Sequence, residues 1–219
     1  EDPIEYSIDG VNQSQVRPDI GYTFANGLRT TLRQDPDIIM VGEIRDSETA
    51  QLAIQAALTG HLVLATIHTN NAVGVVPRLI DMKVDPYLIA PTLILAMAQR
   101  LVSALCADSG TPIPYDDSMK MLIENEFKTL PEQFRKEINI GKEFFRASPS
   151  PTCPNGTRGR LAVMEVLEMD KELETVLLKN ATELEIQKIA RAKGMLSMKE
   201  DAIIKASHRQ IPFEEVISL

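Results

Sequence analysis

The sequence predicts an α/β fold built on a parallel sheet, and three observations indicate it. Two short apolar runs, 38–41 and 61–66, are bounded by turn residues, as is typical of buried parallel strands. Between them, 46–58 carries alanine and isoleucine at helical spacing, and Asp46 or Ser47 can cap its first turn. A strand, a helix and a strand in this order form a βαβ unit, in which the two strands are parallel.

Length and composition limit the classes of protein to which the chain can belong. It has 219 residues, of which 44% are hydrophobic and 25% charged, and its net charge is −8. This is enough for one good core, or for a core with a small satellite. The acidic balance, without a run rich in lysine and arginine, disfavours nucleic acid as a partner. Two cysteines, no signal peptide and no long apolar span favour a reducing cytosol.

The elements before the βαβ unit are a hairpin and a helix. Residues 6–17 alternate apolar residues around Asp9-Gly10, and this pattern predicts a hairpin. Residues 23–34 carry apolar side chains at helical spacing and predict a helix.

The elements after the unit are predicted to be mainly helical. The stretch 85–102 is the most apolar and is interpreted as a core helix, with prolines near its start that allow a kinked entry. A β-like run follows at 161–167, and Thr182 with Glu185 forms a capping box in the helical segment after it. The other predicted helices are 72–82, 117–127, 131–138 and several between 171 and 219, with Gly194 as a cap.

Polar residues follow both strands of the βαβ unit. Glu43 and Arg45 come just after the first strand, and His68 and Thr69 come just after the second. Because ligands of open α/β sheets bind beyond the carboxyl ends of the strands, these groups can converge on one site. An acid at this place suits Mg²⁺ coordination through water, or the orientation of a water near a phosphate. The alternative is that Glu43 and His68 are merely solvated strand-end residues.

Three stretches together resemble the type II secretion and type IV pilus assembly ATPase family. DPDIIMVGEIRD at 35–46 resembles its variant Walker B motif, with Gly42 where many P-loop proteins carry aspartate. TGHLVLATIHTNNA at 59–72 resembles its His box, and EDPIEY at 1–6 resembles its Asp box. The likeness runs along nearly the whole chain. It implies a partial RecA-like P-loop ATPase core of parallel-sheet βαβ units, followed by a smaller, mainly helical C-terminal subdomain.

The resemblance also implies a domain organisation and a cellular role. The implied domains are a RecA-like core at 1–105, a degenerate tetracysteine-type subdomain at 106–160, and a helical C-terminal subdomain at 161–219. Proteins of this family are cytoplasmic, hexameric, Mg²⁺-dependent ATPases. The resemblance therefore implies ATP and Mg²⁺ as ligands, a homo-hexameric ring, and an inner-membrane platform protein as partner, with the motor peripheral to that membrane.

Three residues of these motifs are the candidate catalytic groups. The resemblance implies that Glu5 of the Asp box polarises the attacking water, as a general base or a water-positioning group. Glu43 is the candidate ligand of Mg²⁺, directly or through water, and His68 is the third catalytic candidate. The alternative for Glu5 is a strand-end acid paired with a nearby arginine.

Four further residues are candidate nucleotide contacts. Arg29 and Arg33 lie four apart on one helical face, and in the family such arginines reach a nucleotide, sometimes one held by a neighbouring subunit. A surface ion pair is the alternative for both. Arg17 is a further candidate, although Asp19 stands where the family often has a basic residue. His61 of the His box is the fourth.

Two departures from the family pattern shape the expectations. No G-x-x-x-x-G-K-[ST] motif occurs in the sequence, so we expect a fragment that lacks the phosphate-binding loop and is inactive alone. Where the family's assembly branch often has two C-x-x-C pairs, Cys106 is followed by Ser109, and Ser150 precedes Cys153. Two thiolates cannot close a structural zinc site, so no zinc is expected. The cysteines can approach in space, but a disulfide is not expected in the cytosol.

Three functions are compatible with these motifs and with the composition. The leading one is a cytoplasmic ATP-hydrolysing motor subunit for type IV pilus assembly or type II secretion. The second is a non-catalytic assembly module of such a motor. The third is a RecA-like DNA-linked translocation ATPase, against which the charge of −8 argues.

Overall fold

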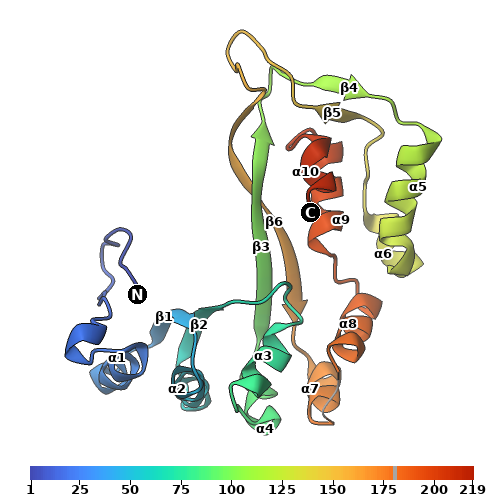
Figure 1. Ribbon diagram of the computed structural model, residues 1–219. Helices are drawn as coiled ribbons and strands as arrows, with labels where there is room; N and C mark the ends of the chain where they lie inside the picture. The colour runs from blue at the N-terminus through green and yellow to red at the C-terminus, as the bar shows by residue number, and fades with distance from the viewer. Residues whose placement is uncertain (180–181) are drawn as a thin grey trace. The chain divides into compact units, whose positions relative to one another are not determined.

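The computed structural model describes residues 1–179 and 182–219, which form two compact units (Figure 1). Unit 1 comprises Glu1–Ile94 and Met169–Ile186, and unit 2 comprises Leu95–Glu168 and Gln187–Leu219. Each unit thus joins segments that are distant in the sequence. The division of the chain into 1–105, 106–160 and 161–219 stays a prediction.

Unit 1 contains a parallel pair of strands with helices packed beside it. Its elements are η1 (Pro18–Ile20), α1 (Phe24–Thr31), η2 (Leu32–Gln34), β1 (Ile38–Ile44), α2 (Ser47–Leu58), β2 (Leu62–Ile67), α3 (Val75–Asp81), α4 (Pro86–Ile89) and α7 (Lys171–Leu177). The predicted βαβ unit is confirmed, because β1 and β2 pair in parallel and α2 connects them. Asp46 caps α2 as predicted, since its side chain accepts from Thr49 N at 2.8 Å.

One face of the unit 1 strand pair is covered and the other is open. Ile39 and Val41 of β1 are buried, whereas Ile38 and Met40 are 61% and 65% exposed. This alternation follows from the pleat of a strand, which points successive side chains to opposite faces. Helices α1 and α2 contact β1.

The N-terminal segment forms the predicted turn but not the predicted hairpin strands. Val11 N donates to Ile8 O at 3.2 Å across Asp9-Gly10, and Gly10 has a φ of +79°, which glycine adopts without strain. Neither flank is a strand. The side chain of Gln13 occupies the backbone groups that a ladder would use, because it accepts from Ile8 N and donates to Tyr6 O.

Unit 2 contains two antiparallel strand pairs and the helices packed on them. Its elements are β3 (Leu95–Leu105), β4 (Thr111–Ile113), α5 (Asp117–Glu126), η3 (Phe127–Thr129), α6 (Glu132–Glu137), β5 (Phe144–Arg146), β6 (Thr157–Glu168), α9 (Met198–Ser207) and α10 (Phe213–Ile217). Strand β3 pairs with β6, and β4 pairs with β5. Helix α8 (Glu183–Ala192) begins in unit 1 and ends in unit 2.

The prediction of a helix over 85–102 is wrong. Only the short α4 forms there, and β3 starts at Leu95. The alanine, leucine, methionine, glutamine and arginine of this stretch have high helix propensity. Pairing with the long strand β6 outweighs this helix propensity and makes the stretch a strand. The ladder between β3 and β6 extends from Leu95 opposite Glu168 to Leu105 opposite Thr157.

The core of unit 2 is closed by large side chains. Phe144 of β5 is fully buried, and its ring meets Phe213 edge-on at a centroid distance of 5.2 Å and stacks with Tyr115 at 5.9 Å. Ile203 of α9 and Val216 of α10 are fully buried in the same core. Each large apolar side chain buried in this way contributes roughly 1.5–3 kcal/mol relative to exposure.

Two predicted helix-end signals are confirmed in the C-terminal region. Thr182 N donates to Glu185 Oε2 at 2.7 Å, and Glu185 N donates to Thr182 Oγ1 at 3.3 Å, which is the predicted capping box. Gly194 follows α8 with a φ of +96°, as a helix-ending glycine does.

The two cysteines form a disulfide, contrary to the expectation from the sequence. Cys106 follows β3 directly, and Cys153 lies shortly before β6. Because β3 and β6 pair up to Leu105 and Thr157, the pairing itself brings the flanking loops together, and the two Cα atoms lie 6.6 Å apart.

None of the helices within the described residues is long and apolar enough to cross a membrane.

Candidate active site

Glu43 lies at the carboxyl end of the parallel strand pair. The register between β1 and β2 is regular through Val41 and shifts before Ile44. Gly42 and Glu43 thus lie at the irregularity, and such irregularities are common beside active sites, where they redirect a side chain. The side chain of Glu43 is only 12% exposed. It is therefore a largely buried carboxylate at the sheet edge where α/β proteins bind ligands.

Three side chains form a connected network with the Glu43 carboxylate. Arg45 Nε donates to Glu43 Oε2 at 2.5 Å, and His68 Nε2 lies 3.2 Å from the same oxygen. Asp2 joins through Arg45, whose Nη1 is 3.5 Å from Asp2 Oδ2. The hydrogen bond from Arg45 holds the pKa of Glu43 below its usual range, against the opposing effect of burial, and His68 adds to the lowering. Glu43 is therefore ionised at neutral pH and acts only as an acceptor.

Gly42 is needed because the N-terminal segment packs against the end of β1. A Cβ at Gly42 would lie 3.1 Å from Cα of Glu1, and a backbone atom cannot move aside as the end of a side chain can. Thr66 of β2 donates to Gly42 O at 2.5 Å and fixes the same point from the neighbouring strand. A side chain at Gly42 would therefore require the backbone at Glu1, next to the Asp2 that contacts Arg45, to shift by a few tenths of an ångström.

The structure brings some predicted catalytic residues together but not all. Glu43 and His68 meet, as their positions after the two strands predict. Glu5 is exposed, and the Asp-box acid that contacts the network is Asp2. His61 lies at the opposite, amino end of β2, where its Nδ1 is 2.9 Å from Ala56 O at the end of α2. The catalytic role of Glu5 and the nucleotide contact of His61 stay predictions.

The three candidate arginines all lie before β1. Arg29 Nη2 forms an ion pair with Glu48 in the first turn of α2. Arg17 forms two hydrogen bonds to Asp19, at 3.0 and 2.9 Å, and they hold the pKa of Asp19 below its usual range. Arg33 is exposed in η2. All three are accessible on the surface of unit 1, so each stays a candidate for a contact that another chain completes.

The residues at this edge are of the kind that suits Mg²⁺ bound together with a nucleotide. The described residues include no cluster of three or more His, Cys, Asp or Glu side chains that could hold a metal ion. Mg²⁺ keeps several waters and takes one or two carboxylates together with substrate phosphates. Glu43, ionised and at the sheet edge, offers one carboxylate of this kind.

Two members of the network, Asp2 and Arg45, were not predicted from the sequence to contact Glu43 or one another. Asp2 was overlooked, although it stands in the same EDPIEY motif as Glu5. A motif with three acids, Glu1, Asp2 and Glu5, does not reveal which of them contacts the network. Arg45 was expected at the edge, but its hydrogen bond to Glu43 depends on the irregularity in the register, which the sequence does not show.

A family model described as "Type II/IV secretion system protein" matches residues 1–218 of the chain. The chain is 44% identical over 218 residues to the type II secretion system ATPase E of Vibrio cholerae, a match that covers 99% of this chain and 41% of that protein. It is 43% identical over 220 residues to the type IV pilus assembly ATPase PilB of Thermus thermophilus, covering 100% of this chain and 24% of that protein. The chain thus spans less than half the length of these curated relatives.

Two solved structures are similar in fold over nearly the whole chain. The pilus retraction motor PilT, solved with bound ADP, matches with a TM-score of 0.66 and 25% identity, over 100% of this chain and 50% of that one. The ATPase DotB of Legionella pneumophila matches with a TM-score of 0.63 and 25% identity, over 99% of this chain and 48% of that one. The predicted fold class is confirmed.

Proposed function

The chain belongs to the type II secretion and type IV pilus assembly ATPase family, and we propose that it is part of a motor subunit that hydrolyses ATP to ADP and phosphate. The proposed work is type IV pilus assembly or type II protein secretion. The observation that carries the proposal is the Glu43 network. It holds an ionised carboxylate at the carboxyl edge of two parallel strands, within reach of a histidine from the second strand.

In this proposal Glu43 orients the attacking water or a water on Mg²⁺. The bound nucleotide and cation supply the reacting phosphoryl group and the charge that stabilises it. Arg45 keeps Glu43 deprotonated and fixes Oε2 by a hydrogen bond, and Asp2 in turn holds Arg45. His68 and Glu5 are the proposed further catalytic residues.

The proposed assembly is a homo-hexameric ring that acts on an inner-membrane platform protein from the cytoplasmic side. Arg29, Arg33 and Arg17 are the proposed contacts to nucleotide, with at least one of them acting on a neighbour's nucleotide. In this structure Arg29 forms an exposed ion pair with Glu48, and Arg17 forms one with Asp19. Such exposed pairs contribute little stability, so a nucleotide phosphate can displace them at small cost. His61 is the remaining proposed nucleotide contact.

The chain by itself is proposed to be a poor ATPase. It has no G-x-x-x-x-G-K-[ST] motif, and this loop supplies the amide groups and the lysine that hold the β- and γ-phosphates. Positioning and charge stabilisation are nearly all that a protein contributes to phosphoryl transfer, so the loss is severe.

The test compares the 219-residue chain with an extended protein, in which the residues of the Vibrio cholerae relative outside the matched region are fused to the chain in their order in that relative. Phosphate release is measured for both across a dilution series. We expect negligible turnover from the chain and turnover from the extended protein that falls on dilution, because assembly completes the site. If the 219-residue chain hydrolyses ATP rapidly, with a turnover per chain that does not change on dilution, the proposal is contradicted.

A second candidate function is a non-catalytic assembly module, which the missing phosphate-binding loop favours. Titration calorimetry with ATP separates the two. If the extended protein binds no ATP, or binds it and never turns it over, the module is the better description.

A further inference from the structure

The disulfide between Cys106 and Cys153 closes the base of an inserted segment in unit 2. The two cysteines are 47 residues apart in the sequence, and the chain between them forms β4, α5, α6 and β5. Hydrogen bonds join the same two loops beside the disulfide. Cys106 N donates to Gly156 O at 3.1 Å, and Ser109 Oγ donates to Gly156 O at 2.6 Å. We call these four residues, Cys106, Ser109, Cys153 and Gly156, the clasp.

The two serines near the cysteines hold the loops by hydrogen bonds. Ser109 is 4% exposed, and its hydroxyl is engaged with Gly156 O. Ser150 Oγ donates to Asp108 Oδ2 at 2.9 Å and accepts from Cys153 N at 3.1 Å. The loops are therefore joined in two ways. The hydrogen bonds are insensitive to redox conditions, whereas the one sulfur–sulfur bond can be reduced.

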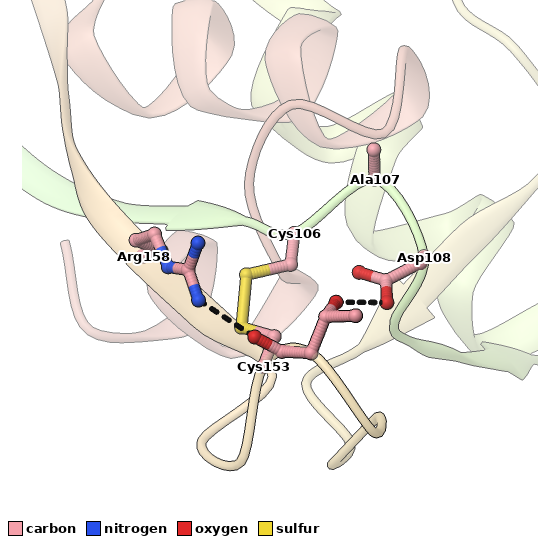
Figure 2. Close-up of a pocket in the computed structure, with 6 residues that line it drawn as sticks. Cys106, Ala107, Asp108, Cys153 and Arg158 are labelled. Carbon is pink, nitrogen blue, oxygen red and sulfur yellow. Dashed lines mark hydrogen bonds between the residues drawn. A yellow bond between two sulfur atoms is a disulfide. The ribbon is translucent and has the colours of Figure 1, made fainter.

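A cavity gives small molecules access to the sulfur–sulfur bond (Figure 2). It has a volume of about 340 Å³ and is lined by Cys106, Ala107, Asp108, Thr152, Cys153 and Arg158. Cys153 is 2% exposed, whereas Cys106 is half-buried, so Cys106 is the more accessible residue of the pair. Arg158 donates to Thr152 O and brings a positive charge to the cavity, which favours a thiolate, while the Asp108 carboxylate in the same lining opposes it.

We propose that Cys106 and Cys153 form a thiol–disulfide exchange site that opens and closes the clasp, with a dithiol as its reductant. A thiolate of the dithiol attacks Cys106 Sγ, which forms a mixed disulfide and breaks the bond to Cys153. Cys153 leaves with the electron pair and takes up a proton. The second thiol of the dithiol, as a thiolate, then attacks the dithiol sulfur that is bonded to Cys106. Cys106 leaves as a thiolate and is protonated. The protein gains two thiols, and the dithiol departs as a cyclic disulfide.

Reduction loosens the base of the insertion without unfolding unit 2. The hydrogen bonds of Ser109 remain, and so does the core around Phe144 and Ile203. The reduced chain regains the conformational freedom that the closed loop removes from the unfolded state. We therefore expect the melting temperature of unit 2 to fall by about 5–15 °C on reduction, which is the shift that loss of a typical disulfide produces in a protein of this size.

The test uses the 219-residue chain, purified in air and then treated with dithiothreitol in buffer without denaturant. Thiols are counted with a thiol-reactive dye, and unfolding is followed by calorimetry. We expect no reactive thiol before treatment, two after it, and the stated fall in melting temperature. Two free thiols in the untreated protein, a bond that opens only in denaturant, or equal melting temperatures in both states would each overturn the proposal.

Two variants separate the redox bond from the hydrogen bonds. The double variant C106A/C153A is expected to melt like the reduced chain and to be insensitive to dithiothreitol. Ser109→Ala is expected to lower the melting temperature in both redox states while the difference between them persists. Reduced chain is also incubated with zinc, desalted and analysed for metal. About one retained zinc per chain would overturn the proposal, because the pair would then be a metal site.

Discussion

Unit 1 and unit 2 differ in the kind of side chains that are their most distinctive feature. The buried aromatic side chains of the described residues, Phe127, Phe144 and Phe213, all lie in unit 2. Unit 1 has none, and its distinctive feature is the polar network of Glu43, Arg45, His68 and Asp2 at the end of its strands. The candidate chemistry thus lies in unit 1, whereas the buried aromatic side chains lie in unit 2.

The open face of the unit 1 strands extends the same contrast. Parallel strands are normally covered on both faces, yet Leu62 and Leu64 of β2 are 48% and 50% exposed. Strand β3 of unit 2 also has an exposed face, with Met97 63% exposed, but its other face carries the aromatic core. We expect unit 1 to gain more stability than unit 2 from the surface that the extended protein adds.

The largest expected effect concerns the arginines of unit 1. If Arg29 or Arg33 acts on a neighbour's nucleotide, its replacement by alanine in the extended protein lowers turnover by about 10³–10⁵. Mixing each variant with subunits that carry Glu43→Gln sharpens the test, because a site formed from two different subunits regains activity. The exposed Lys83, on the same unit, offers a matched control as Lys83→Ala. Turnover that stays near the parent in both arginine variants would mean that neither arginine acts on a nucleotide.

The next effect measures the core of unit 2. Phe144→Ala is expected to lower the free energy of unfolding of unit 2 by about 3–5 kcal/mol, because it deletes a fully buried ring and leaves a cavity. Met121→Ala is the control, since Met121 is 61% exposed in the same unit and should change stability by less than about 0.5 kcal/mol. Urea unfolding of both variants makes the comparison. Equal losses would show that the aromatic core does not stabilise unit 2 as described.

The βαβ unit could be predicted from the sequence because its signals are local. The caps, the glycine after the helix and the two apolar runs all lie within 35–69, and β1, α2 and β2 appear where they predict. Strand β3 could not be predicted in this way. Its residues favour a helix, and its partner β6 begins some fifty residues further along the chain.

The candidate site was predictable in part for the same reason. Glu43 and His68 follow adjacent parallel strands, so the topology alone brings them to one edge. Asp2 reaches Arg45 only because the N-terminal segment packs on Gly42, a contact between distant parts of the chain. The disulfide could not be predicted because the pairing of β3 with β6, which brings the loops of Cys106 and Cys153 together, is not visible in the sequence.

The smallest expected effect is a change in the titration of Glu43. Arg45 is the main cause of the lowered pKa, with His68 second, and Asp2 reaches the network only through Arg45. In Arg45→Gln the pKa of Glu43 should rise, and a ¹³C NMR titration of its carboxyl carbon measures the change in the 219-residue chain. Lys83→Gln, which removes a positive charge elsewhere in unit 1, should leave it unchanged.

The sign of the effect on stability follows from the direction of the shift. Because folding lowers the pKa of Glu43, its contribution to stability is present above the unfolded pKa and is lost as the pH falls through the folded pKa. In Arg45→Gln the lowering of the pKa is smaller, so this contribution should be smaller and the stability of the variant should depend less on pH over the same range. A Glu43 titration that is the same with and without Arg45 would show that the hydrogen bond does not control it.

The role of Glu43 is tested most directly by Glu43→Gln in the extended protein, with turnover and ATP affinity measured together. The amide keeps the shape of the side chain and removes the charge that orients water and metal. We expect turnover to fall by at least about 10² while the dissociation constant for ATP changes only a few-fold. Asp37→Asn, just before the amino end of β1, should leave turnover near the parent value. Turnover of Glu43→Gln within a few-fold of the parent would contradict the proposal that this carboxylate orients the water or the metal during hydrolysis.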